Sequence, residues 1–172
     1  EEGYYSALPD PYPVKNRPFD STAELMLVRG VTPDIYQRIK DYVTIFPKAG
    51  PFKINLDTAS LPVLKALARS WTGPKTNTDI GEADSLAEKM VAYRRADDDL
   101  EGTKDDRIID TVTMGLTPTE MVLSLLMENQ RTFKSDYLRV RVVGKDDESS
   151  ISTEVIAVVK RSNLSIVEWQ RK

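Results

Sequence analysis

The chain has 172 residues, and its 24 Lys and Arg against 27 Asp and Glu give a formal net charge of −3. This balance argues against a dedicated nucleic-acid binder, because such proteins usually carry a basic surplus. The absence of cysteine and histidine excludes thiolate nucleophiles, disulfides, Ser-His-Asp triads and the usual zinc sites. The widely spaced glycines leave no Gly-rich phosphate loop. No spacing of the remaining polar residues indicates an active site, so we expect no enzyme.

Residues 1–19 form a lead-in that is rich in proline and tyrosine. Proline fixes φ and lacks a backbone donor, so we expect this segment to be extended. These residues are Tyr4, Tyr5, Pro9, Pro11, Tyr12, Pro13 and Pro18.

Two short helices are predicted directly after the lead-in. Ser21 and Glu24 have the spacing of a capping box, and Gly30 stands where a helix ends. Thr32 and Pro33 then begin a second helix, as N-cap and first-turn proline. The buried faces are expected to consist of Leu25, Leu27, Val28, Ile35, Tyr36 and Ile39.

Three longer helices are predicted further along the chain. The first begins near Leu61, the second spans residues 85–95 and the third spans residues 118–129. Residues 72–81 are expected to form a loop. The apolar residues expected on their inner faces are Leu64, Leu67, Ala68, Leu86, Met90, Tyr93, Met121, Val122, Leu125 and Leu126.

The sequence becomes strand-like after residue 131. Apolar and polar residues alternate over 137–143, and β-prone runs follow at 153–160 and 164–169. The polar residues 144–150 are expected to form the first turn of this antiparallel meander. Arg139 and Arg141 are expected to lie on one face and to pair with Glu154 across the sheet. Two shorter β-prone pieces precede this region, at 42–46 and 52–56.

A G-φ-T-P pattern occurs twice, at 30–33 and at 115–118. Each copy predicts a glycine turn followed by a newly capped helix, which indicates a helical hairpin used twice. Helix-hairpin-helix modules present free backbone N–H groups to a DNA phosphate at such turns. A β-branched threonine crowds that approach here, so a structural turn is favoured. A DNA-binding or DNA-uptake module is the alternative.

An acidic loop spans residues 97–106. Oxygen-rich loops with a central glycine can wrap Ca²⁺, although the EF-hand spacing is not met. Calcium is thus the candidate cofactor, and its candidate ligands are Asp97, Asp99, Glu101 and Asp105. A solvated surface loop is the favoured interpretation.

Three tracts occur in a fixed order: N-R-P-F-D-S at 16–21 with G-V-T-P following, I-N-L-D-T-A at 54–59, and S-D-Y-L-R-V at 135–140. In this order they resemble the minor pseudopilin K family of type II secretion. Asp57 and Leu138 depart from the family pattern, in which Asn and an aromatic residue are usual. The positions that carry the resemblance are Phe19, Asp20, Ser21, Glu24, Gly30, Thr32, Pro33, Ile54, Asn55, Thr58, Ala59, Ser135, Tyr137 and Arg139.

The resemblance implies an α+β fold. A helical domain of SAM-like or helix-hairpin-helix-like type, with two hairpin-like units over residues 20–130, would precede a C-terminal antiparallel β meander of pilin-like type over 131–172. In a pilin body a long N-terminal helix covers one face of the sheet. We therefore expect a segment outside this chain, or a partner, to cover Leu138, Val140, Val142, Val155, Ala157 and Val159.

The resemblance also implies a function without catalysis. The family acts at the tip of the secretion pseudopilus, where it caps or initiates the fibre together with the minor pseudopilins I and J. The chain would be the periplasmic domain of an inner-membrane-anchored protein whose N-terminal membrane helix it lacks, and no nucleic acid is expected as a partner. Some family members carry calcium in the helical domain. A type IV pilus tip minor pilin is a further alternative.

Overall fold

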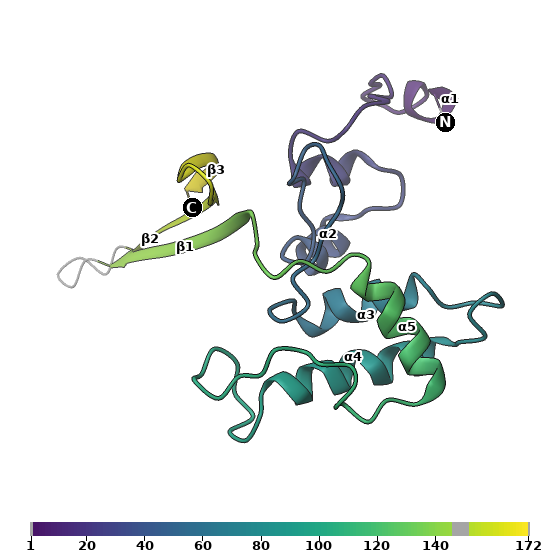
Figure 1. Ribbon diagram of the computed structural model, residues 1–172. Helices are drawn as coiled ribbons and strands as arrows, with labels where there is room; N and C mark the ends of the chain where they lie inside the picture. Colours follow the sequence, from purple (N-terminus) through teal and green to yellow (C-terminus); the bar gives the residue numbers. More distant parts are fainter. Residues whose placement is uncertain (1, 146–151, 172) are drawn as a thin grey trace. The chain divides into compact units, whose positions relative to one another are not determined.

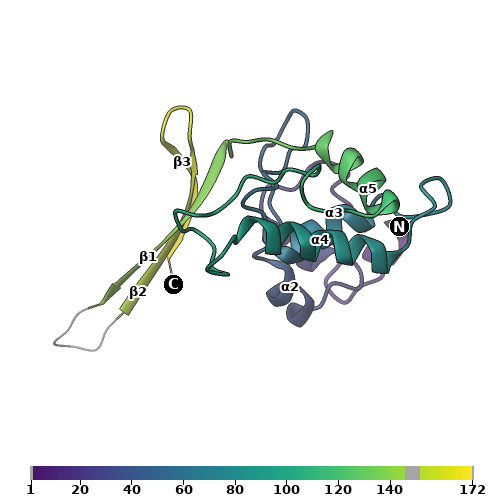
Figure 2. The same ribbon diagram turned by 60° about the horizontal axis from the view of Figure 1, so that its bottom comes forward.

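The computed structural model describes residues 2–145 and 152–171, which form helices followed by a three-stranded antiparallel sheet (Figures 1 and 2). The predicted α+β class is confirmed, while the SAM-like or helix-hairpin-helix type of the helical domain stays a prediction. The chain divides into two compact units, Glu1–Ala49 and Gly50–Lys172. The elements are α1 Glu2–Ser6, the 3₁₀ helix η1 Thr22–Leu27, α2 Pro33–Ile39, α3 Leu61–Arg69, α4 Ile80–Arg94, α5 Pro118–Glu128, β1 Tyr137–Lys145, β2 Ser152–Lys160 and β3 Ser165–Arg171.

The lead-in is not extended throughout, because α1 forms at its start. The first proline is Pro9, so the prolines restrict only the chain beyond this helix. Tyr5 is buried, and its hydroxyl accepts a hydrogen bond from the backbone N–H of Arg29 at 3.1 Å. Tyr12 donates its hydroxyl to the carbonyl of Leu27 at 2.6 Å. Tyrosines therefore attach the lead-in to the segment that follows η1.

The first predicted helix is a short 3₁₀ helix that ends before Gly30. Val28, which is β-branched, is already in extended backbone conformation at its end. None of the residues of η1 or α2 is fully buried, and Leu25, Tyr36 and Ile39 are half-buried, so the predicted apolar faces are only partly covered within this unit. Leu27, Val28 and Ile35 are exposed.

The core of the second unit lies between α3, α4 and α5. Leu64, Leu67 and Ala68 are buried as predicted. Helix α4 begins at Ile80, five residues earlier than expected. The reason is that Asp79, which lies in the predicted loop 72–81, forms a capping box with Glu82. The core residues are Leu56, Leu64, Leu67, Ala68, Ala83, Leu86, Ala87, Met90, Val91, Ile109, Leu123 and Met127.

The buried face of α5 differs from the prediction. Val122 and Leu125 are exposed, and Met121 and Leu126 are half-buried. The reason is that α4 provides hydrogen-bond donors for the carboxylate of Glu120, so this acidic residue lies in the helix interface. The buried residues of α5 are Glu120, Leu123, Ser124 and Met127.

The sheet is a meander in the order β1-β2-β3, as predicted. Val140 lies opposite Ala157, and Ala157 lies opposite Trp169, with a register shift at Val158 and Val159. The β-prone pieces at 42–46 and 52–56 form no strand. Only Ile54 makes an isolated parallel bridge, to Arg131. Among the described residues, no helix has the length and apolar character that crossing a membrane requires.

Candidate interaction surface

One face of the sheet consists of apolar side chains from all three strands. Residues paired across neighbouring strands point to the same face, so the register defines this set. We call it the apolar face. Its apolar members are Leu138, Val140, Val142, Val155, Ala157, Val159, Ile166 and Trp169, and Arg171, which lies opposite Val155, is the charged residue at its edge.

The apolar face is largely open to solvent. Leu138, Val140 and Val142 are 46%, 42% and 58% exposed, and Trp169 is 65% exposed. Val155, Ala157 and Val159 of the central strand are half-buried. Within residues 50–145 and 152–171, no helix packs on the sheet. These side chains are therefore not fully packed within this part of the chain, and a surface of this kind is typical of an interaction site. Their coverage by a segment outside this chain or by a partner stays a prediction.

The opposite face of the sheet is mixed. Its polar residues are Arg139, Arg141, Glu154, Glu168 and Gln170, and its apolar residues are Val143, Ile156 and Val158. Arg141 forms an ion pair with Glu154, as predicted. The opposite face thus carries more charged groups, so burying the apolar face removes fewer charges from water.

The first motif tract makes local contacts. The carboxylate of Glu24 accepts hydrogen bonds from the backbone N–H groups of Asp20 and Ser21 at 2.9 and 3.2 Å. Lys15 donates to Asp20 at 2.9 Å and to Glu24 at 2.5 Å, and these hydrogen bonds lower the pKa of both carboxyls. Phe19 is exposed.

The second motif tract is a turn to which distant parts of the unit attach. The side-chain oxygen of Asn55 accepts from the N–H of Asp57 at 3.1 Å, and its carbonyl accepts from Thr58 and Ala59. Arg94 at the end of α4 is buried, and it donates to the carbonyls of Leu56 and Ala59 at 2.9 and 2.6 Å.

The carboxylate of Asp57 binds Arg131 at 2.7 Å. Neither Arg94 nor Arg131 was predicted as a partner of this tract. A carboxylate where the family pattern has an amide was the available signal for Arg131, because a buried carboxylate requires a cation.

In the third motif tract, Tyr137 begins β1 and Arg139 lies on the face opposite the apolar face. Ser135 precedes the strand and is half-buried. The tract residues with described hydrogen bonds thus act in turns and caps, each within its own unit.

The two G-φ-T-P turns begin helices that are capped by their own side chains. Gly30 and Gly115 have φ values of +87° and +64°, which favour glycine. Thr32 accepts from the N–H of Ile35, and Thr117 accepts from that of Glu120. The second copy follows a non-helical turn instead of a helix, so it is not a helical hairpin. These capping bonds compete with phosphate binding at the same amides.

Three of the acids in the acidic loop pair with arginines. Asp97 pairs with Arg107 at 3.0 Å, Asp99 with Arg95 at 3.5 Å, and Glu101 with Arg94 at 2.6 Å. The Arg94 hydrogen bond lowers the pKa of Glu101.

The fourth candidate ligand, Asp105, accepts from the hydroxyl of Thr103 at 2.7 Å. Among residues 2–145 and 152–171, no three acidic side chains group to hold a metal ion. The four carboxylates thus do not fit calcium as arranged here. Calcium binding stays a prediction, which a rise in melting temperature on calcium addition, abolished in Asp99→Asn, would support.

Glu120 is the most strongly perturbed acid in the unit. Burial by itself would raise its pKa, but hydrogen bonds from Lys89, the Thr117 N–H and Ser85 outweigh burial and lower the pKa to about 2. The Lys89 and Ser85 bonds measure 2.6 and 2.8 Å. This network joins α4 to α5, and the sequence pattern alone indicated only its capping part.

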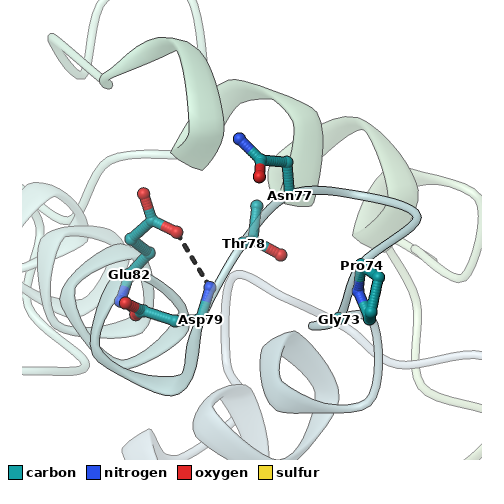
Figure 3. A pocket seen from close by; sticks show the side chains of 6 residues that line it. All are labelled: Gly73, Pro74, Asn77, Thr78, Asp79 and Glu82. Carbon is teal, nitrogen blue, oxygen red and sulfur yellow. Dashed lines mark hydrogen bonds between the residues drawn. The ribbon is translucent and has the colours of Figure 1, made fainter.

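A shallow depression of about 480 Å³ lies beside the start of α4 (Figure 3). It is lined by the turn residues Gly73, Pro74, Asn77 and Thr78 together with Asp79 and Glu82. Both acids are engaged in the capping box, since Glu82 accepts from the Asp79 N–H and Asp79 accepts from the Glu82 N–H, each at 2.9 Å. The lining therefore offers no activated group.

Comparison with known proteins gives two matches. A family model described as protein K of the type II secretion system matches residues 1–48. A chain in the crystal structure of the GspK-GspI-GspJ complex from the type 2 secretion system of enterotoxigenic Escherichia coli is similar in fold, with a TM-score of 0.61 and 19% identity. No curated protein matches the sequence.

The fold match covers 100% of this chain and 55% of that one, so this chain spans about half of its length. The two matches together confirm the resemblance to minor pseudopilin K.

Proposed function

From this resemblance we propose that the chain is the periplasmic part of a minor pseudopilin that caps or initiates the type II secretion pseudopilus. The observation that carries the proposal is the match of residues 1–48 to protein K of this system. The function does not require catalysis. The helical core and the sheet act through their shape and through the surfaces that they present.

The apolar face supports this role. Exposed apolar area of this kind is stabilised when another element covers it, at roughly 25 cal/mol per Å² buried. We propose that the occupant is a helix of the longer protein, which precedes this chain and anchors it to the inner membrane. The matched region makes up 55% of the similar solved chain, so that chain has further residues outside the match.

The partners we propose are the minor pseudopilins I and J. They are the types of protein that accompany GspK in the complex containing the similar chain. The match to a secretion protein also favours a pseudopilus over a type IV pilus tip.

Co-purification tests the proposal. The chain, tagged and co-expressed with the periplasmic domains of pseudopilins I and J, is expected to retain both through size-exclusion chromatography. Failure to retain either one would contradict the proposal. A DNA shift assay over a range of salt concentrations tests the rival, because DNA binding that weakens steeply with salt would favour a nucleic-acid module.

A further inference from the structure

Arg131 lies where the chain leaves the helices for the sheet. It follows α5 directly, and its side chain is only 7% exposed. Its guanidinium donates to the Asp57 carboxylate at 2.7 Å, to the Glu128 carboxylate at 2.7 Å and to the Ile109 carbonyl at 3.1 Å. A buried arginine with two carboxylates is bound much more firmly than an exposed ion pair.

The partners of Arg131 come from three separate segments. Asp57 belongs to the turn before α3, Ile109 to the connection between α4 and α5, and Glu128 to the last turn of α5. Asp57 also accepts the backbone N–H of Ile109 at 2.8 Å, which closes the group of contacts. The guanidinium of Arg131 therefore contacts three segments that lie far apart in the sequence: the turn before α3, the connection between α4 and α5, and the end of α5.

The backbone reinforces this group on the side of the sheet. Ile54 donates to the carbonyl of Gln130 at 2.8 Å and accepts from the N–H of Thr132 at 2.9 Å. The ring of Phe133 lies 4.4 Å from the guanidinium carbon of Arg131. At the other end of the connection, the carbonyl of Asp136 accepts from the N–H of Arg161 at 2.9 Å.

We propose that Arg131 is a clamp that turns residues 129–136 from a free linker into a strap fixed to the helical core. Removing the clamp releases the strap by local opening, while α3, α4 and α5 stay folded through their apolar core. The proposal goes beyond the pseudopilin role and does not depend on it, since it concerns how the chain holds its own sheet connection.

Hydrogen exchange on the full chain tests the clamp. In Arg131→Lys, which keeps the charge but not the three-way geometry, the amides of Thr132 and Ile109 are expected to exchange at least about tenfold faster. Asp57→Asn removes the charge and keeps the size, so it gives the same test if the arginine variant does not fold. The amides of Leu86 and Met90 in α4 are expected to keep their rates.

The matched control is Arg69→Lys, because Arg69 also makes a paired contact with an aspartate, Asp84, at 2.7 and 2.6 Å. It is expected to leave the exchange of Thr132 unchanged. Unchanged exchange at Thr132 and Ile109 in both clamp variants would overturn the proposal. So would an equal acceleration in α4, because Arg131 would then support the whole core and not the strap.

Discussion

Two buried charged side chains make contacts between elements of the second unit. Glu120 of α5 binds Ser85 and Lys89 of α4, and Arg94 of α4 binds the turn before α3. Both are almost fully buried, at 2% and 3% exposure. Each is satisfied by several hydrogen bonds, which is the condition under which a charge is tolerated inside a protein. Their contributions to stability can be separated by substitution.

Glu120→Gln is expected to destabilise the chain at neutral pH by up to about 3 kcal/mol, the equivalent of its pKa depression from 4.5 to about 2. Because the folded pKa is lowered, this stabilisation is complete above pH 4.5 and is lost as the pH falls toward 2. Denaturant unfolding at pH 7, 4 and 2.5 measures it. A variant with undiminished acid sensitivity between pH 4.5 and 2 would contradict this assignment, and Glu82→Gln in the exposed box of α4 is the control.

Arg94→Met is expected to cost about 2–3 kcal/mol, because the carbonyls of Leu56 and Ala59 lose their donor. Glu101→Gln removes the other partner of Arg94. It is expected to cost less than about 1 kcal/mol, since Glu101 is 45% exposed. Urea unfolding compares the two variants. Equal losses would show that the ion pair, and not the carbonyl contacts, gives Arg94 its importance.

These buried contacts could not be predicted from the sequence. Asp57 and Arg131 are 74 residues apart, and no periodicity links them. Local signals served better, since the Thr32 cap and the Ser21–Glu24 spacing were predicted from neighbouring residues alone. The buried face of α5 was predicted wrongly. The spacing of apolar residues along a helix does not show that α4 supplies hydrogen-bond partners for Glu120.

At the scale of elements, the sheet was the most predictable part. The alternation of Leu138, Val140 and Val142 with Arg139 and Arg141 fixes which residues share a face, and the observed register agrees with it. Ile166 and Trp169 of β3 were not predicted on the apolar face, because the register shift at Val158 and Val159 cannot be read from alternation.

The cysteine-free chain allows a direct test of what covers the apolar face. Val140→Cys and Val143→Cys place single thiols on opposite faces of β1, at positions that are 42% and 47% exposed. Both are expected to react with maleimide in the isolated chain. In the longer, membrane-anchored protein that we propose, the Val140→Cys thiol is expected to be protected while the Val143→Cys thiol still reacts. Equal labelling of the two in the anchored protein would contradict coverage by a helix.

At the scale of the whole molecule, the two units differ in their apolar cores. Tyr5 is the one buried apolar residue described for residues 2–49, whereas the second unit has a continuous core between its helices. The region that matches the family model is thus the part with less internal packing. Its motif was recognisable in sequence through turns and caps, and its apolar stripe was not fully buried where helical periodicity placed it.

Expressed separately, residues 50–172 are expected to unfold cooperatively, and residues 1–49 are expected to show little stable structure. The reason is that a fragment without a buried core cannot offset the conformational entropy of folding. Circular dichroism during thermal unfolding measures both fragments. A cooperative transition in residues 1–49 alone would contradict this difference.

The mass of the assembled complex tests the central claim most directly. A cap adds once to a fibre end, so mixing this chain with the periplasmic domains of pseudopilins I and J is expected to give a complex with one copy of each, measured by size-exclusion chromatography with light scattering. Excess chain should remain a separate monomer. A chain that stays alone while I and J associate, or that adds in several copies, would contradict a capping subunit.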